Sequence, residues 1–170
     1  EDLISQFGRE SFDLLISTEL MEHVLVWRSV TSNFKNMLKP DGVVLITTRS
    51  KGYGYHGAPF DFWRYEISDM EAMYADFDIE ALEKDPQHEG VFIKARKPMI
   101  FSETDVTDYP LFSIIKNRRS KTVGEFDLRV VKARLATQHI LAKILPRPLK
   151  RVTKKLMMLR GKRMWLTTHY

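Results

Sequence analysis

The chain has no cysteine, no long apolar run and very few acidic residues in its last third. The lack of cysteine excludes a disulfide framework, an iron–sulfur site and a thiolate zinc site, and it favours a reducing, cytoplasmic setting. No stretch approaches the roughly 18 consecutive apolar residues of a membrane-spanning helix, and the acidic start is unlike a secretory signal. The chain also begins at Glu1 rather than Met, so we expect it to be a piece of a longer protein.

The charges divide the 170 residues into two regions. Residues 1–115 hold 11 Lys or Arg and 20 Asp or Glu, whereas residues 116–170 hold 16 and 2. The boundary lies near the turn-rich stretch 104–110. The apolar content of 44% is typical of one globular domain, so we expect a folded first region and a basic extension.

Strand and helix patterns alternate in the first region. Residues 12–17 and 43–48 are short apolar runs that predict strands, of which the first is typical of a parallel strand covered on both faces. Between them, apolar residues recur at three- and four-residue steps from Leu20 to Leu38, which predicts a helix that stops at the turn 39–42. This order predicts a parallel crossover unit.

A second helix and a hairpin follow a loop of about 17 residues. Ser68 or Asp69 is placed to cap a helix that runs through Phe77, and residues 79–83 and 91–96 predict two strands. The five residues that join these strands favour an antiparallel hairpin. We therefore predict an α/β sheet with two parallel strands and a terminal hairpin.

The two parallel strands lead into the most unusual stretches of the chain, 18–23 and 49–66. Ligands bind at the carboxyl ends of parallel strands in open α/β sheets, because loops and helix N-termini meet there. The second stretch carries six aromatic residues, which argues against disorder. We expect both stretches to lie together above the sheet.

Three motifs resemble a known family. The segments 12–24 (FDLLISTELMEHV), 38–42 (LKPDG) and 59–65 (PFDFWRY) resemble, in this order, the second half of a class I S-adenosylmethionine-dependent methyltransferase over residues 1–98. The resemblance implies a partial Rossmann-like sheet with strands four to seven of that fold. The domain plan is then 1–98 for this part, 99–115 for a linker and 116–170 for a basic helical extension.

The same resemblance implies that the first three strand–helix units are missing. In this family a glycine-rich loop holds the amino-acid part of the cofactor S-adenosylmethionine, and an acidic residue holds its ribose; neither has a counterpart here. Thr18 and Glu19 are implied to lie beside the methionine part. We expect that the chain alone does not bind the cofactor and that the exposed edge of strand 12–17 promotes aggregation.

Three side chains at helical spacing make a candidate metal site. Glu19, Glu22 and His23 stand at positions i, i+3 and i+4, so a helix would place them on one side. Two carboxylates and an imidazole suit Mg²⁺, Mn²⁺ or Zn²⁺, and His56 is available to complete the set. The pattern resembles the metal-binding helix of small-RNA 2′-O-methyltransferases and ubiquinone-pathway O-methyltransferases. The alternative is that the acids only favour the positive end of a helix.

His23 and His56 are the candidates for a general base, since a neutral imidazole accepts a proton near physiological pH. The alternative for each is a structural role. Asp61, Trp63 and Arg64 are candidates for a substrate-facing lid in which Arg64 grips an anionic group. The alternative is that the aromatic residues anchor the loop while Arg64 pairs with Asp61 or Glu66.

The basic extension predicts an amphipathic helix over residues 126–145 and a second basic segment up to Leu166. Such a segment can lie on an anionic membrane surface, can equally attract RNA phosphates, or can cover the acidic first region. The alternative is a solvated accessory helix whose charge is balanced inside the chain. We favour the membrane surface over nucleic acid, because the apolar face is strong and no aromatic stacking series accompanies the lysines.

The resemblance implies a parent enzyme that moves a methyl group from S-adenosylmethionine to an oxygen or nitrogen of an acceptor. The acceptor is left open and includes small molecules and glycan- or lipid-linked groups. Two alternatives of other classes also stay open. One is a non-catalytic remnant that binds partners, and the other is a membrane- or RNA-docking module that uses half of the fold.

Overall fold

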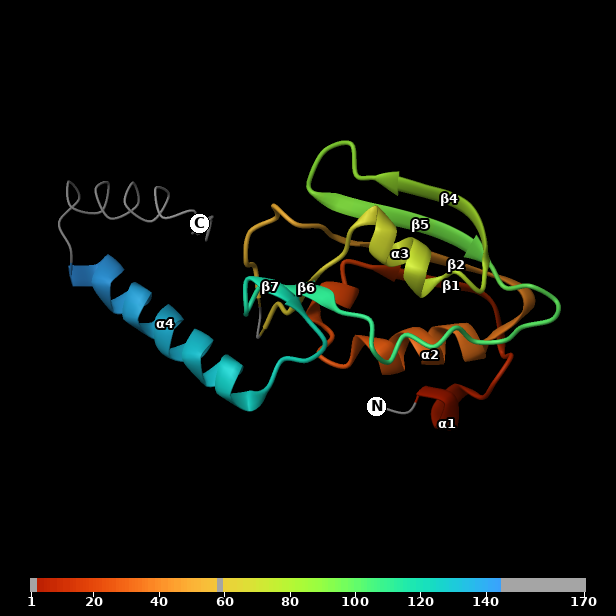
Figure 1. Ribbon diagram of the computed structural model, residues 1–170, viewed down its shortest axis with the longest axis horizontal. Helices are drawn as coiled ribbons and strands as arrows, with labels where there is room; N and C mark the ends of the chain where they lie inside the picture. Colours follow the sequence, from red (N-terminus) through yellow and green to blue (C-terminus); the bar gives the residue numbers. More distant parts are fainter. Residues whose placement is uncertain (1–2, 58–59, 145–170) are drawn as a thin grey trace.

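A four-stranded mixed sheet forms the body of the chain (Figure 1). The computed structural model describes residues 3–57 and 60–144. The strand order is β1-β2-β5-β4, with β1 and β2 parallel and the other two pairings antiparallel. The predicted parallel crossover and the hairpin are both confirmed. The bounds are β1 (Phe12–Thr18), β2 (Leu38–Arg49), β4 (Asp78–Lys84) and β5 (Gly90–Arg96).

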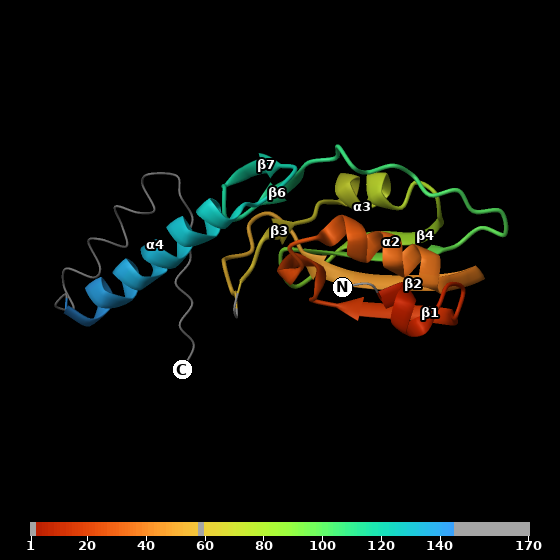
Figure 2. The same ribbon diagram turned by 90° about the horizontal axis from the view of Figure 1, so that it is seen from below.

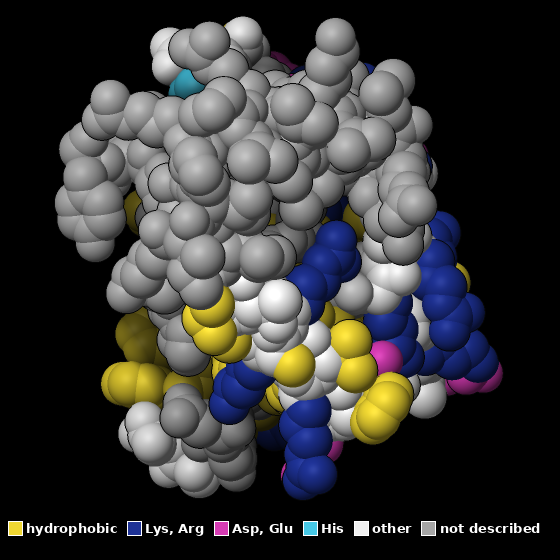
Figure 3. All heavy atoms as spheres, turned by 90° about the vertical axis from the view of Figure 1, so that its left-hand side faces the viewer, with side chains coloured by type: hydrophobic (Ala, Val, Ile, Leu, Met, Phe, Trp, Pro, Cys, Tyr) yellow, Lys and Arg dark blue, Asp and Glu magenta, His cyan; other side chains and the backbone are white. Residues whose placement is uncertain are grey.

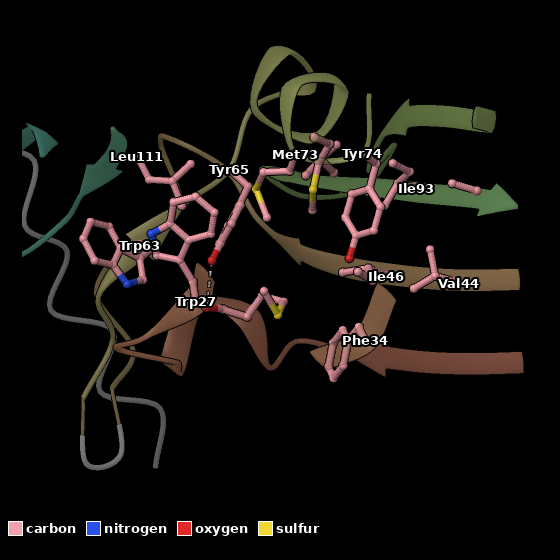
Figure 4. Packing of buried hydrophobic residues seen from close by; sticks show 14 of the residues in the cluster. Trp27, Phe34, Val44, Ile46, Trp63, Tyr65, Met73, Tyr74, Ile93 and Leu111 are labelled. Carbon is pink, nitrogen blue, oxygen red and sulfur yellow. Dashed lines mark hydrogen bonds between the residues drawn. The ribbon is translucent and has the colours of Figure 1, made fainter. Parts of the chain in front are cut away.

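Two helices cover one face of this sheet (Figure 2). They are α2 (Trp27–Met37), between β1 and β2, and α3 (Ile67–Met73), before β4, while the short α1 (Leu3–Phe7) precedes β1. Their apolar sides meet the strands in a core rich in aromatic and methionine side chains (Figure 4). The core side chains labelled there are Trp27, Phe34, Val44, Ile46, Trp63, Tyr65, Met73, Tyr74, Ile93 and Leu111.

The opposite face of the sheet is open at β1. The side chains of Leu14 and Ile16 point to this face and are 53% and 60% exposed, and Val43 and Leu45 of β2 are only half-buried. The expectation that residues 12–17 are covered on both faces is therefore wrong for the described residues, because no described helix packs on this side. β1 is also an edge strand, so one row of its backbone groups has no partner strand.

The single helix predicted from Leu20 to Leu38 is divided. Residues Met21–His23 form one turn of 3₁₀ helix, η1, and α2 begins only at Trp27. The carbonyl of Glu22 accepts a hydrogen bond from the N–H of Phe62 at 2.8 Å, so a neighbouring loop takes an acceptor that a continuous helix would use. The helix ends before residues 39–42, as predicted: these residues are assigned to β2, but Asp41 has a positive φ of 66° and the pairing with β1 passes irregularly from Leu38 to Val43.

A second, small sheet joins the stretch after residue 98 to the body. β3 (Trp63–Arg64) pairs with β6 (Leu111–Ser113), which pairs with β7 (Arg118–Ser120). The guanidinium of Arg28 donates hydrogen bonds to the carbonyls of Val106, Tyr109 and Lys121. The predicted linker 99–115 thus packs on α2 and contains a strand, while the domain plan itself stays a prediction.

Helix α4 (Glu125–Ile144) extends away from the body beyond β7 (Figure 1). It confirms the helix predicted for residues 126–145 as far as Ile144, and residue 145 lies outside the described residues. The second basic segment, up to Leu166, lies outside the described residues. Within the basic extension, side-chain exposure is described for residues 116–137 and for Ile140.

One pair of substitutions tests the two faces of the sheet. Ile16 is 60% exposed, so Ile16→Thr should change the free energy of unfolding by less than about 0.5 kcal/mol. Ile46 is fully buried, so Ile46→Thr should lower it by about 2–3 kcal/mol through lost packing and a buried hydroxyl. Urea unfolding measures both values. Light scattering should show less self-association for Ile16→Thr, and equal destabilisation by the two substitutions would contradict an open face.

Candidate functional site

Two chain segments meet at the carboxyl ends of β1 and β2. The first is η1 with its flanks, and the second is the loop from Ser50 to Phe62 that follows β2. Two hydrogen bonds join η1 to the loop: the Phe62 N–H donates to the Glu22 carbonyl, and His23 Nδ1 donates to the Phe60 carbonyl. Just after the loop, Trp63 Nε1–H donates to the Leu25 carbonyl and the Tyr65 hydroxyl donates to the Met21 carbonyl. The sequence prediction that the two stretches lie together is confirmed, and His23 and Trp63 are at the same end of the molecule.

A buried ion pair fixes the second loop. Asp61 is fully buried and accepts hydrogen bonds from Arg64 Nη1 at 2.5 Å and Nη2 at 2.6 Å. The other guanidinium N–H groups donate to the carbonyls of Tyr53, Gly54 and Trp63. All five N–H groups of Arg64 are therefore used inside the protein. The expected grip on an anionic substrate gives way to the alternative, a pair with Asp61.

The two other lid candidates are equally enclosed. The side chain of Trp63 is 1% exposed and that of Asp61 is not exposed at all. Burial alone would raise the pKa of Asp61, but the hydrogen bonds from Arg64 and His56 outweigh it and lower the pKa. These side chains hold the loop in shape, and the surface facing the site comes from other residues.

His56 lies between two carboxylates. Its Nδ1 is 3.0 Å from Asp61 Oδ2, and its Nε2 is 3.6 Å from Glu22 Oε1. The hydrogen bond to Asp61, followed by the interaction with Glu22, raises the pKa of His56 to about 9. In the metal-free protein His56 is thus a cation at neutral pH and does not act as a base.

Glu22 is fully buried at the base of the site. Its Oε2 accepts a hydrogen bond from Thr48 Oγ1 at 2.8 Å, whereas its Oε1 has no hydrogen-bond partner. Burial alone would raise the pKa of Glu22, but the interactions with His56, its own backbone and Thr48 lower it. A buried carboxylate oxygen therefore points toward the imidazoles with a free lone pair.

His23 differs from His56 in its surroundings. Its Nδ1 is 2.7 Å from the carbonyl oxygen of Phe60. Because a carbonyl only accepts, Nδ1 carries the proton, and in the neutral ring Nε2 keeps its lone pair. The rings of His23 and His56 are in edge contact, with centroids 4.7 Å apart. Glu22, His23 and His56 each offer a ligand atom, and these atoms all lie within 4.8 Å of one another.

Glu19 is not part of this cluster. Its backbone has a positive φ of 51°, its Oε1 accepts a hydrogen bond from Thr47 Oγ1 at 3.0 Å, and its carboxylate pairs with Arg49. The predicted set of Glu19, Glu22 and His23 is therefore corrected: His56 takes the place of Glu19. The helical spacing failed as a guide because Glu19 precedes η1 rather than sharing a helix with Glu22. Thr18 ends β1 and is exposed beside the site.

Sequence reasoning missed two residues at the end of β2. Thr48 orients Glu22, and Arg49 neutralises Glu19 while its guanidinium lies over the ring of Tyr53, 4.3 Å from the centroid. Both are the last residues of β2, the strand that leads into the second loop. Their position at the carboxyl end of a parallel strand is the signal that could have identified them.

Comparison with known proteins gives one family match and a set of similar folds. Residues 1–46 match the family model for a methyltransferase domain. No curated protein sequence matches the chain.

Three similar solved structures come from bacteria. The first is a possible exported protein from Bordetella parapertussis, with 20% identity and a TM-score of 0.40 over 53% of this chain and 40% of that one. The second is 1,6-didemethyltoxoflavin-N1-methyltransferase from Burkholderia thailandensis, with 14% identity and a TM-score of 0.42 over 54% of this chain and 46% of that one. The third is an S-adenosylmethionine-dependent methyltransferase from Mesorhizobium loti, with 15% identity and a TM-score of 0.43 over 52% of this chain and 63% of that one. The chain thus spans less than two thirds of the length of each. The family resemblance predicted from the sequence is confirmed for residues 1–46, which match the methyltransferase domain family.

Proposed function

We propose that this chain is the acceptor-side part of an S-adenosylmethionine-dependent methyltransferase. The observation that carries the proposal is the meeting of η1 and the loop after β2 at the carboxyl ends of two parallel strands. Residues 1–46, which contain β1, η1, α2 and the first part of β2, match the methyltransferase domain family. The parent enzyme moves a methyl group to an oxygen or nitrogen of its acceptor. The glycine-rich part that holds the donor pairs with the free edge of β1 and covers the open face around Leu14 and Ile16.

Methyl transfer from a sulfonium is a direct displacement. The acceptor atom attacks the methyl carbon, the carbon–sulfur bond breaks, and the acceptor loses a proton. The protein mainly aligns the two partners and accepts that proton. His23 is the better candidate for this role, because its Nε2 lone pair is free while His56 is held as a cation. Thr18 and Glu19, at the end of β1, are proposed to lie beside the methionine part of the donor.

A divalent metal ion fits the cluster of Glu22, His23 and His56. Metal-bound imidazoles usually donate their second N–H to a carboxylate or a backbone carbonyl. Both rings meet this condition, since His56 faces Asp61 and His23 faces the Phe60 carbonyl. The free Oε1 of Glu22 supplies the third ligand atom. Two imidazoles and one carboxylate favour Zn²⁺ or Mn²⁺ over Mg²⁺ or Ca²⁺. A bound metal would act as a Lewis acid that lowers the pKa of an acceptor hydroxyl.

Calorimetry with S-adenosylmethionine tests the proposed division of the enzyme. The 170-residue chain should show no binding in the micromolar range, whereas the parent that also carries the glycine-rich part should bind. Micromolar binding by the chain alone would contradict the division. A parent that fails to bind the donor would contradict the methyltransferase proposal itself.

The pH dependence of stability tests the state of His56. Its folded pKa of about 9 lies above the unfolded value of about 6.5, so the folded state binds the proton more tightly. The resulting stabilisation is complete below about pH 6.5 and disappears as the pH rises through about 9. Relative to His56→Gln, the metal-free protein should lose about 2 kcal/mol of unfolding free energy over this interval. Parallel pH profiles for the two proteins in urea unfolding would exclude a protonated His56.

Metal titration tests the three-residue cluster. ZnCl₂ or MnCl₂ should bind the chain at one high-affinity site, and His23→Ala or His56→Ala should each weaken it by about tenfold or more. His88→Ala is the matched control, because His88 is an exposed imidazole in the hairpin turn and should leave the affinity unchanged. Equal affinities for all four proteins would rule out a metal at this cluster and leave His23 as a base alone.

A further inference from the structure

We infer that helix α4 docks on an anionic lipid surface. The helix extends from the body rather than packing along it, and the described part of the chain contains no helix long and apolar enough to cross a bilayer (Figure 2). The surface of α4 must therefore be explained by contact at an interface or by solvent alone. The apolar side chains and the charges of α4 decide between an interface and solvent.

An exposed apolar stripe runs along α4. Phe126, Val130 and Ile140 are 77%, 50% and 55% exposed. Positions 126, 130, 133, 137 and 140 follow one another at three- or four-residue steps, so these three side chains share one face with the small residues Ala133 and Thr137. The half-buried Leu128, Val131 and Leu135 occupy the other side of the helix. A row of large apolar side chains on a projecting helix indicates a partner with an apolar interior.

The charges around this stripe are positive. Helix α4 carries four basic residues, Arg129, Lys132, Arg134 and Lys143, and two acidic residues. Both acids are already engaged within the chain: Asp127 pairs with Lys116 at 3.2 Å, and Glu125 contacts Arg129 at 3.5 Å. Seen from this end, apolar and basic side chains of the described residues lie next to each other (Figure 3). This combination matches anionic headgroups above an acyl-chain layer.

Nucleic acid explains this surface less well. RNA phosphates would account for the basic residues, but they leave the apolar stripe in water. Phe126 is the only aromatic side chain on α4, so the helix offers no stacking series for bases. A second copy of the chain would bury the stripe but would bring two basic helices together. A lipid surface accounts for both the apolar stripe and the basic residues.

Sedimentation of the full chain with vesicles tests the inference. The chain should bind vesicles of phosphatidylcholine with phosphatidylglycerol much more strongly than vesicles of phosphatidylcholine alone, and high salt should weaken this binding. Phe126→Ser combined with Ile140→Ser should reduce the partition coefficient by about tenfold or more, because both apolar contacts with the acyl region are lost. Arg129→Gln combined with Arg134→Gln should reduce only the component that depends on the anionic lipid.

The matched control is Met99→Ser combined with Ile100→Ser. These side chains are 74% and 94% exposed and lie on the loop after β5, far from α4 in the chain, so their loss should leave vesicle binding unchanged. Circular dichroism confirms that each variant is folded. The inference is overturned if the α4 and control variants bind equally, if the chain binds homopolymeric RNA but not vesicles, or if the stripe variants change only the oligomeric state.

Discussion

The site depends on the buried carboxylate of Asp61. An unpaired charge in this position would be strongly destabilising, so the fold surrounds it with two guanidinium N–H groups of Arg64 and with the backbone N–H and Nδ1 of His56. These partners come from both sides of Asp61 in the sequence, and together they close the loop after β2 on itself. His56 is presented to Glu22 as part of the same arrangement.

The charges of the site are arranged in alternation from this centre outward. Arg64, Asp61, His56 and Glu22 follow one another, and each opposite neighbour favours the charged form of the next. His56 thereby loses the ability to accept a proton in the metal-free protein, although the sequence offered it as a candidate base equivalent to His23. The two imidazoles are distinguished by their partners: a carboxylate holds one as a cation, and the carbonyl of Phe60 leaves the other with a free Nε2. The proposed base is therefore His23 rather than His56.

Much of the sheet could be predicted from the sequence, because its signals are local. The apolar runs of β1 and β2, the five-residue turn between β4 and β5 and the length of α4 each follow from hydrophobic period and turn residues. The features that escaped prediction depend on contacts between distant segments. The break between η1 and α2 requires the N–H of Phe62, and β3 is a strand only because β6, nearly fifty residues later, pairs with it.

The same distinction applies to the site. The meeting of the two loops could be predicted, since it follows from parallel strands. The partners of individual side chains could not be predicted, because the sequence acid-x-x-acid-His is the same whether Glu19 binds a metal or pairs with Arg49. The positive φ of Glu19 decides the matter, and it arises where β1 ends and η1 begins. Likewise, Arg64 has the right charge for an anionic substrate. Only its five hydrogen bonds within the protein show that no guanidinium N–H group is left to bind one.

Two apolar surfaces of this chain lack a partner among the described residues, and they call for different kinds of contact. The edge of β1 combines exposed Leu14 and Ile16 with backbone groups that pair with no described strand, so another protein strand suits it. The stripe on α4 has its backbone bonds made within the helix and carries cations at its sides, so a fluid, anionic layer suits it. Thr18 lies at the end of β1, and Lys132 of α4 lies over the ring of Phe60, 5.1 Å from its centroid. Each surface therefore belongs to an element that reaches the site: β1 through Thr18 and α4 through Lys132.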